Sequence, residues 1–243
     1  MTHTILFLLV WLFPFNLLSN QPFAAPSAIR VSAPSAHRPP APASATQVKA
    51  RQQGVSITVD TVKHQLIVYK GTRAVNRYPV AVGTYAAPSP IGDWKVVMKQ
   101  KDWGSGFGTR WIGLNVPWGI YGIHGTNRPE SIGNRASHGC VRMFNQDVEQ
   151  VYNVVRIGTP VHIVGDVLQG YGGYPRMLVS GDIGSDVQLV QNRLRGAGYF
   201  HGACNGKFDP ATEIALKAFE KSRGLTVDGT VSWRDYHALG LVE

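Results

Sequence analysis

Residues 121–143 read YGIHGTNRPESIGNRASHGCVRM, and the interpretation of the whole chain starts from this stretch. Its first four residues are typical of the end of a β-strand, and His124 closes them. Cys140 follows later in the stretch, with His138 two residues before it and Arg142 two residues after it. Side chains two apart in an extended chain point to the same face, so these three are expected to lie together. The stretch predicts a reactive cluster at the edge of a β-rich domain.

The thiol of Cys140 is a candidate nucleophile. A free cysteine has a pKa of about 8.5, so a nearby base or cation has to lower that pKa before the thiolate forms at neutral pH. His124 can reach Cys140 if the loop 127–136 folds back, and Arg142 adds a fixed positive charge. Gly139 permits close approach of a substrate and leaves its amide free for an oxyanion. These residue types favour a thiol enzyme.

Two other interpretations of the same residues stay open at this point. His124, His138 and Cys140 could bind zinc as a three-ligand set, although a catalytic zinc site usually also uses a carboxylate base. Glu130 is the only acidic residue in the loop between the two motifs. The cysteine could also be a small buried apolar residue, and each histidine a hydrogen-bonded structural one. Spacing alone does not separate these alternatives.

Two motifs give the chain a resemblance to a known family. The chain resembles the L,D-transpeptidases (YkuD domain) in the run Ser137-His138-Gly139-Cys140-Val141-Arg142 and in the preceding His124-Gly125-Thr126. The similarity extends over residues 54–164 and includes the turn Pro88-Ser89-Pro90-Ile91-Gly92. At the second position of that turn the family tends to have threonine. Some branches of the family carry asparagine where this chain has Arg142.

This resemblance implies roles for the clustered residues. Cys140 would be the nucleophile and His124 the proton donor and acceptor. The neighbours would also take part, with the site and its oxyanion pocket shaped by Ser137, His138 and Gly139, and with the substrate or nucleophile supported by Arg142. No metal ion and no organic cofactor is implied.

The activity that the resemblance implies is cysteine-dependent acyl transfer in cell wall biogenesis. Cys140 would attack the peptide bond between the third residue of a peptidoglycan stem and its terminal D-Ala, which leaves. The side-chain amine of a neighbouring stem would then take the acyl group, giving a 3-3 cross-link. Water in place of that amine would make the chain an L,D-carboxypeptidase or endopeptidase. A third possibility is a non-catalytic wall-binding protein with an inert thiol.

The residues around this stretch predict a mostly-β domain over 54–165 that carries one helix. Apolar residues alternate with polar ones at 57–59 and again at 66–68, which predicts a hairpin. Further strands are expected over 78–82, 94–98, 121–123 and 161–164. The helix is expected to take Asn145 as its N-cap and to end at Gly158. The fold class is therefore α+β, with a mostly-β catalytic domain followed by a small all-α module.

The helical module is expected over residues 181–243, after a linker over 166–180. Three helix starts are predicted from Ser185 with Gln188, from Asp209 before Pro210, and from Ser232 with Asp235. The order of apolar residues and Asp-Gly turns resembles the three-helix peptidoglycan-binding domain, which implies attachment to the wall polymer. The plainer alternative is a packing appendage. Cys204, in a turn of this module, is expected to be structural or incidental.

The amino-terminal residues predict an export signal and a tether. Residues 5–18 are mostly apolar and would make about 21 Å of helix, short of the roughly 30 Å that a membrane span needs. Small residues follow, so 1–28 are expected to be a signal peptide, with an uncleaved anchor as the alternative. The Ala-, Pro- and Ser-rich residues 29–53 are expected to be a linker. The chain is thus predicted to be exported to the cell wall or a periplasm-like space, without a stable membrane span in the mature protein.

The composition mainly excludes other classes. A hydrophobic fraction of 44% is ample for a packed core, and a charged fraction of 16% is too low for a charge-laced coiled coil. Two cysteines exclude a disulfide scaffold and a four-cysteine zinc site. The net charge of +9 suits an anionic polymer such as a cell wall, and because the basic residues are scattered we expect no nucleic-acid partner.

Overall fold

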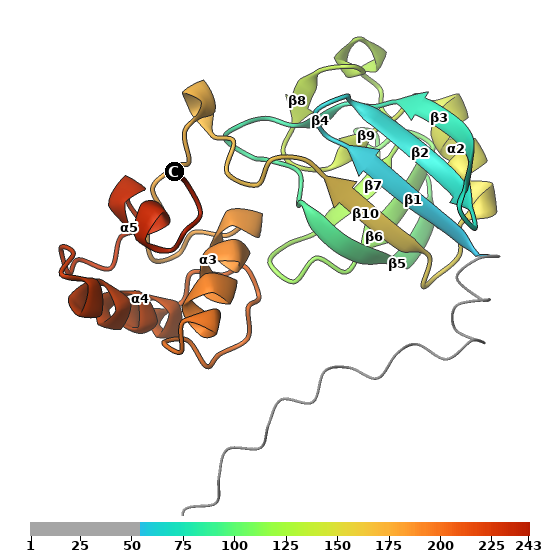
Figure 1. Ribbon diagram of the computed structural model, residues 1–243. Helices are drawn as coiled ribbons and strands as arrows, with labels where there is room; N and C mark the ends of the chain where they lie inside the picture. The colour runs from blue at the N-terminus through green and yellow to red at the C-terminus, as the bar shows by residue number, and fades with distance from the viewer. Residues whose placement is uncertain (1–53) are drawn as a thin grey trace, which may run out of the picture. The chain divides into compact units, whose positions relative to one another are not determined.

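The computed structural model describes residues 54–243 (Figure 1). The signal peptide expected over 1–28 and the linker expected over 29–53 lie outside the described residues. Two separate clusters of buried apolar side chains organise the described part, one within the β-rich residues and one within the helices that follow. These two cores confirm the predicted α+β class, a mostly-β domain followed by a small helical module.

The β-rich domain is built on an eight-stranded mixed sheet with the order β3-β2-β1-β10-β5-β6-β7-β9. Two further strands, β4 and β8, pair with each other in parallel. The strands are β1 Val55–Asp60, β2 Gln65–Lys70, β3 Arg73–Pro79, β4 Val82–Gly83, β5 Gly92–Lys101, β6 Arg110–Leu114, β7 Tyr121–His124, β8 Arg135–Ser137, β9 Val141–Arg142 and β10 Pro160–Val164. A short 3-10 turn, η1 Pro129–Ser131, lies between β7 and β8.

The hairpin predicted from alternating apolar residues is confirmed. β1 and β2 pair antiparallel, with Ile57 opposite Val68 and Val59 opposite Leu66. All four side chains are buried in the core of the β-rich domain, so alternation with period two has placed one face of the hairpin inside. The segment expected as one strand over 78–82 is instead divided between β3 and β4.

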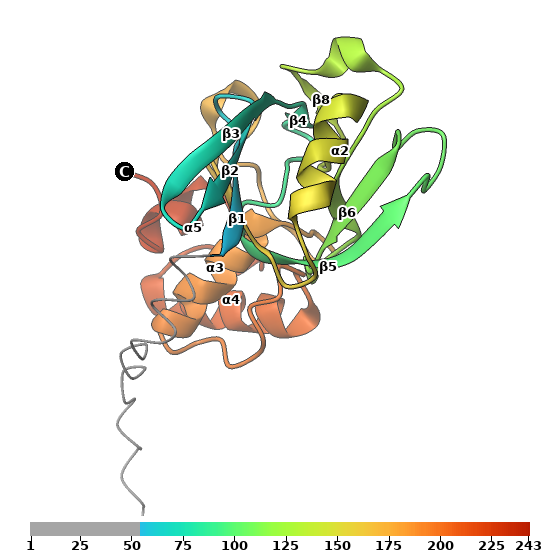
Figure 2. The same ribbon diagram turned by 90° about the vertical axis from the view of Figure 1, so that its right-hand side faces the viewer.

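One helix, α2 Asn145–Val154, packs against β6, beside which Figure 2 shows it, and against β7. Its apolar face buries Val148 and Val151, as the spacing predicts. The predicted N-cap is wrong: Phe144 holds the cap position, and no side chain caps the helix. The predicted end is wrong as well, because the chain leaves the helix at Val155 with an extended backbone, three residues before Gly158.

The helical module contains α3 Ser185–Gly196, α4 Pro210–Arg223 and α5 Trp233–Ala238. The Asp209 cap is confirmed, since its Oδ1 accepts from the Thr212 amide at 2.8 Å. The Ser232 amide donates to Asp235 Oδ2 at 2.9 Å, which completes the predicted capping box of α5. The capping box predicted at Ser185 is wrong, because Gly184 is the N-cap and makes no side-chain bond.

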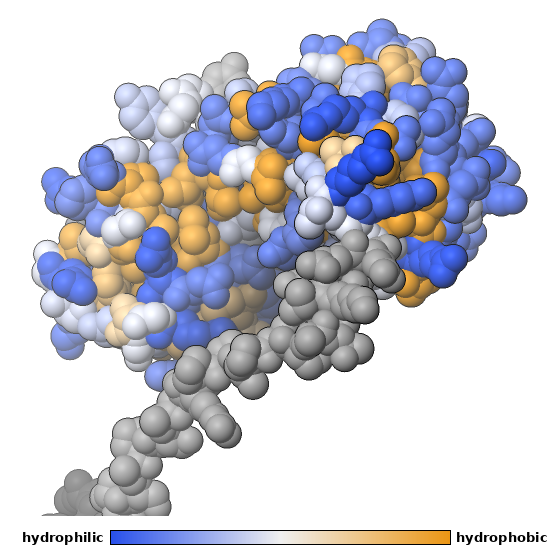
Figure 3. Space-filling view, turned by 45° about the vertical axis from the view of Figure 1, so that its right-hand side comes forward, coloured by the Kyte–Doolittle hydropathy of each residue, from blue (hydrophilic) through white to orange (hydrophobic). Residues whose placement is uncertain are grey.

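The second core also takes in residues from the segment expected as a linker. Leu168 packs against it, and Leu178 is fully buried in it. Leu178 forms a bridge with Val231, with backbone bonds of 3.1 and 2.9 Å, and η2 Tyr171–Gly173 lies between the two leucines. Apolar residues reach the surface in patches among polar ones (Figure 3). Among residues 54–243, no helix has the length and apolar character to cross a membrane.

Candidate active site

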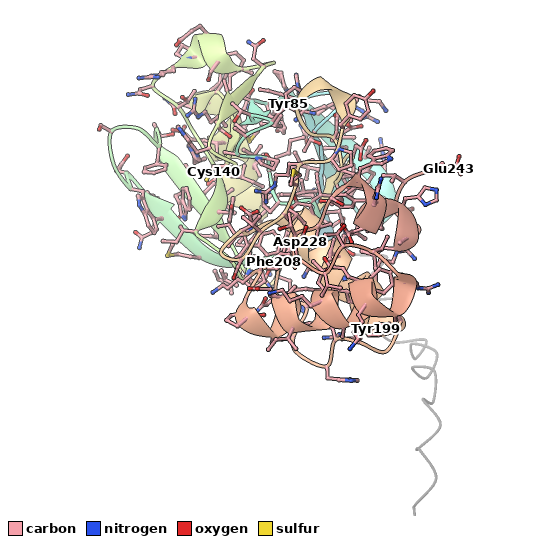
Figure 4. The ribbon with its side chains drawn as sticks, turned by 90° about the vertical axis from the view of Figure 1, so that its left-hand side faces the viewer. Tyr85, Cys140, Tyr199, Phe208, Asp228 and Glu243 are labelled. Atoms are coloured by element: carbon pink, nitrogen blue, oxygen red, sulfur yellow. The ribbon has the colours of Figure 1, made fainter. Side chains whose placement is uncertain are left out.

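Neighbouring strands bring His124 and Cys140 to one face of the sheet. β7 and β9 run parallel, with Ile123 beside Val141 and His124 beside Arg142. The side chains of Ile123 and Val141 are buried in the domain core. Since side chains alternate along a strand, His124 and Arg142 face the opposite side, and Cys140 just before β9 joins them there. Figure 4 labels Cys140, which lies within the β-rich domain.

A hydrogen-bonded turn holds the cysteine in place. The Ser137 hydroxyl donates to the carbonyl oxygen of Cys140 at 2.5 Å and accepts from the amide of Gly139 at 3.1 Å. Gly139 has a φ of +109°, and a Cβ there would lie 2.6 Å from the Tyr121 ring, so only glycine fits. The expectation of a free Gly139 amide is wrong for this structure, because that amide already has the Ser137 oxygen as its acceptor.

An open cavity of about 530 Å³ lies over this face. Five of the six residues singled out from the sequence line it, namely His124, Ser137, His138, Cys140 and Arg142. Gly139, the sixth, is buried within the turn. The remaining lining residues are mostly apolar: Trp103, Gly106, Phe107, Trp111 and Ile120. Residues distant along the chain therefore meet at a cavity that is large enough for part of a peptide.

The imidazole of His124 is buried and fixed in one orientation. It is only 3% exposed, stacks on Trp111 with ring centres 5.5 Å apart, and meets the edge of Phe107 at 5.0 Å. Its Nδ1 lies 2.5 Å from the carbonyl oxygen of Gly125. A carbonyl can only accept, so Nδ1 carries the proton of the neutral ring and Nε2 keeps its lone pair.

The pKa values describe a neutral resting pair. Burial lowers the pKa of His124 from 6.5 to about 4, helped by the charge of Arg142 and opposed by the carbonyls of Gly125 and Phe107. Burial raises the pKa of the Cys140 thiol, against smaller lowering effects of the Gly122 backbone and Arg142. The expectation of a lowered cysteine pKa is therefore wrong. At neutral pH the cavity therefore holds a protonated thiol and a neutral imidazole.

Arg142 leaves its positive charge available to the cavity. Its backbone is anchored in the sheet, since its amide donates to Ala81 and its carbonyl accepts from the Ala81 amide, each at 2.9 Å. No carboxylate among residues 54–243 forms an ion pair with its guanidinium. A planar guanidinium in that state suits a carboxylate of a bound molecule.

The zinc interpretation finds no geometry to support it in the described part of the chain. There, no three His, Cys, Asp or Glu side chains are grouped so that they could hold a metal ion. His138 is exposed on the rim of the cavity, whereas His124 points its Nδ1 at a backbone carbonyl.

The aromatic wall of the cavity was missed in the sequence. Trp103 and Phe107 come from the loop between β5 and β6, and Trp111 comes from β6. Trp103 and Phe107 both contact Trp111, with ring centres 5.0 and 5.2 Å apart. Two aromatic residues within the glycine-rich residues 102–109 were the available signal, because exposed loops seldom carry large rings without a contact surface.

Family models match both folded parts of the chain. Residues 54–163 match the L,D-transpeptidase catalytic domain, and residues 183–232 match the model described as "Putative peptidoglycan binding domain". All residues that line the cavity lie within the range of the catalytic-domain match.

The chain is also similar to two named relatives and to one solved structure. "Putative L,D-transpeptidase YkuD" of Bacillus licheniformis is 41% identical over 107 residues, which are 44% of this chain and 64% of that protein. "Putative L,D-transpeptidase YqjB" of Bacillus subtilis is 34% identical over 125 residues, which are 45% of this chain and 71% of that protein. The catalytic domain of the Enterococcus faecium L,D-transpeptidase, solved by NMR, is 24% identical with a TM-score of 0.41 and covers 46% of this chain and 98% of that one.

Over the described residues 54–243, the fold, the site and the matches define an L,D-transpeptidase catalytic domain followed by a peptidoglycan-binding type of module. The chain belongs to the L,D-transpeptidase family. It spans 64% of the length of the two YkuD relatives from Bacillus.

Proposed function

We propose that this chain is an exported L,D-transpeptidase that cross-links peptidoglycan through a thioester on Cys140. The donor is a tetrapeptide stem, and the bond that breaks joins its third residue to the terminal D-Ala. The acceptor is the side-chain amine at the third residue of a neighbouring stem. Its place of action is the cell wall or a periplasm-like space, with 1–28 as the export signal and 29–53 as a tether.

In the first step the thiol proton of Cys140 passes to Nε2 of His124 as the sulfur attacks the carbonyl carbon of the donor bond. The tetrahedral intermediate then collapses, the carbon–nitrogen bond breaks, and the proton held on Nε2 moves to the leaving amine of D-Ala. Arg142 lies on the same face and attracts the carboxylate of the departing residue. The products of this step are free D-Ala and a thioester on Cys140.

In the second step the acceptor amine attacks the thioester and gives a proton to Nε2 of His124. The carbon–sulfur bond breaks, the proton returns to sulfur, and an amide joins the two stems. Water in place of the amine gives a shortened monomeric stem by the same route. The apolar wall of Trp103, Phe107 and Trp111 limits water around the thioester, which favours the amine.

One observation carries this proposal. His124, with its Nδ1 at the Gly125 carbonyl, and Cys140 line the same open cavity, on one face of two paired strands. A buried structural histidine and an inert cysteine would have no reason to share a solvent-reachable cavity with an unpaired guanidinium. The catalytic-domain match over residues 54–163 includes both residues and supports the same class of chemistry.

The test incubates the purified protein with a disaccharide-tetrapeptide and identifies products by mass spectrometry. We expect cross-linked dimers that have lost one D-Ala. Monomers without D-Ala as the sole product would show that water is the acceptor, making the chain a carboxypeptidase. Unchanged substrate, together with no adduct from a thioester-forming carbapenem, would contradict both and leave a non-catalytic wall-binding protein.

The helical module is proposed to hold the enzyme on its polymer. A chain that ends at Gly165 is expected to sediment with insoluble wall several-fold less than the full chain while it keeps its activity on soluble fragments. The cut falls at this position because Leu168 and Leu178 belong to the core of the module. The full chain with Cys140→Ala is the control, since it should bind the wall like the unmodified protein. Equal sedimentation of the shortened chain would refute the anchoring role.

A further inference from the structure

The side chain of Asn145 has a use other than capping its helix. Asn145 is the first residue of α2, but its Oδ1 turns away from the helix. It accepts hydrogen bonds from the amides of Thr109 and Thr126, each at 3.2 Å. These two amides belong to segments that both adjoin His124: the end of the loop between β5 and β6, and the chain just after β7.

The bond to Thr126 fixes the group that orients the imidazole. The amide of Thr126 and the carbonyl of Gly125 are the two ends of one planar peptide unit. That carbonyl accepts from Nδ1 of His124 at 2.5 Å, while the amide donates to Asn145. Asn145 therefore holds one end of the plane whose other end holds the histidine. Rotation of this peptide unit would remove the acceptor from Nδ1.

The bond to Thr109 fixes the second segment around the same ring. Phe107, two residues earlier, contacts the imidazole with its ring edge, and its carbonyl raises the pKa of His124. The packing around the asparagine oxygen is tight on both sides. A Cβ at Gly108 or at Gly125 would lie 2.1 Å from Oδ1 of Asn145, so each segment needs glycine where it passes the oxygen.

We propose that Asn145 is a positioning residue for His124: by gripping the 125–126 peptide and the 107–109 segment together, it keeps the proton on Nδ1 and leaves Nε2 as the base. This inference rests on the proposed role of His124. In a catalytic triad the orienting group is a carboxylate that contacts the histidine directly. Imposing the wrong tautomer there lowers kcat on the order of 10⁴-fold. Here a backbone carbonyl takes that position, and Asn145 holds the carbonyl.

Three variants of the full chain test the proposal. Asn145→Ala removes the acceptor oxygen, whereas Asn145→Asp keeps an acceptor oxygen in a side chain of the same shape. Asn153→Ala is the matched control, because Asn153 is an exposed asparagine of the same helix. Two quantities are measured for each: the rate at which a carbapenem acylates the thiol, and the ¹⁵N chemical shifts of the His124 ring at pH 7, assigned with His124→Gln.

We expect Asn145→Ala to slow acylation by about 10- to 100-fold, the range for losing a group that orients a functional side chain. In this variant the ¹⁵N chemical shifts of the His124 ring should move toward the average of the two tautomers. In the unmodified chain they should show a protonated Nδ1 and an unprotonated Nε2. Asn145→Asp and Asn153→Ala should match the unmodified chain within about threefold in rate and show its single tautomer. If Asn145→Ala does not fold, Asn145→Ser, which is too short to reach both amides, takes its place.

The ¹⁵N shifts separate this inference from the proposed function. A chain without any acylation, but with the tautomer lost in Asn145→Ala and kept in Asn145→Asp, would contradict the function and retain the positioning role. An unchanged single tautomer in Asn145→Ala would overturn the positioning role whatever the activity. So would an Asn145→Asp chain that is as impaired as Asn145→Ala, because the acceptor oxygen would then not be what matters.

Discussion

The Cys140→Ala chain is expected to release no D-Ala from a disaccharide-tetrapeptide and to gain no mass from a carbapenem. Without the sulfur no acyl-enzyme can form, so the loss of turnover should be on the order of 10⁴-fold or more. The fold should survive the change, since alanine is smaller and the turn bonds are made by Ser137 to backbone groups of Gly139 and Cys140. Intact-protein mass spectrometry and D-Ala release measure the two effects.

The chain contains its own control in Cys204. Both cysteines are free, and both are half-buried. Burial raises the pKa of each thiol. What distinguishes them is their surroundings: Cys140 shares its cavity with His124, whereas Cys204 packs against the apolar core of the helical module. Cys204→Ala should keep at least half of the activity. Equal losses in the two variants would show that the assignment of the nucleophile is wrong.

Local patterns allowed much of the fold to be predicted. Alternation of apolar residues predicted the β1–β2 hairpin, and the Asp209–Pro210 pair predicted the start of α4, because both depend on neighbours in the sequence. The predicted cap at Asn145 failed for a non-local reason, because its oxygen accepts from two amides of other segments. At Ser185 the neighbouring Gly184 takes the cap position instead.

The polar residues that line the cavity could be predicted from the sequence, but its aromatic wall and the protonation of its side chains could not. The spacing of His138, Cys140 and Arg142 indicated one face, and the parallel pairing of β7 with β9 brings His124 beside Arg142. Whether the pKa of Cys140 is raised or lowered depends on how deeply the thiol is buried, which residue types do not reveal. The tautomer of His124 depends on the direction of one carbonyl group, that of Gly125, and so on a side chain from α2.

The second large effect concerns His124 and pH. Because its pKa is about 4, the imidazole is neutral and able to accept a proton at every pH above about 5. The rate of acylation by a carbapenem should therefore stay level from about pH 5 to the region where the thiol ionises. Toward lower pH the rate should fall, with a midpoint near pH 4 and not near the ordinary 6.5, and then by about tenfold per pH unit. His124→Ala should lower the plateau by about 10²- to 10⁴-fold.

The shape of the profile in the variant decides what the histidine does. Without a base, only the small fraction of thiolate reacts, so the His124→Ala rate should climb about tenfold per pH unit until the thiol ionises. His201→Ala, at an exposed position of the module, should keep the unmodified profile.

The pH dependence of protein stability offers a second check on the lowered pKa of His124. Between pH 6.5 and 4 this histidine is protonated in the unfolded chain but not in the folded one. The free energy of unfolding of the unmodified protein should therefore fall by about 3 kcal/mol on acidification through that range. His124→Ala should not show that loss of stability. An equal acid destabilisation in the variant would mean that the imidazole is not buried as a neutral base. So would a rate of acylation in the unmodified chain that falls with a midpoint near pH 6.5.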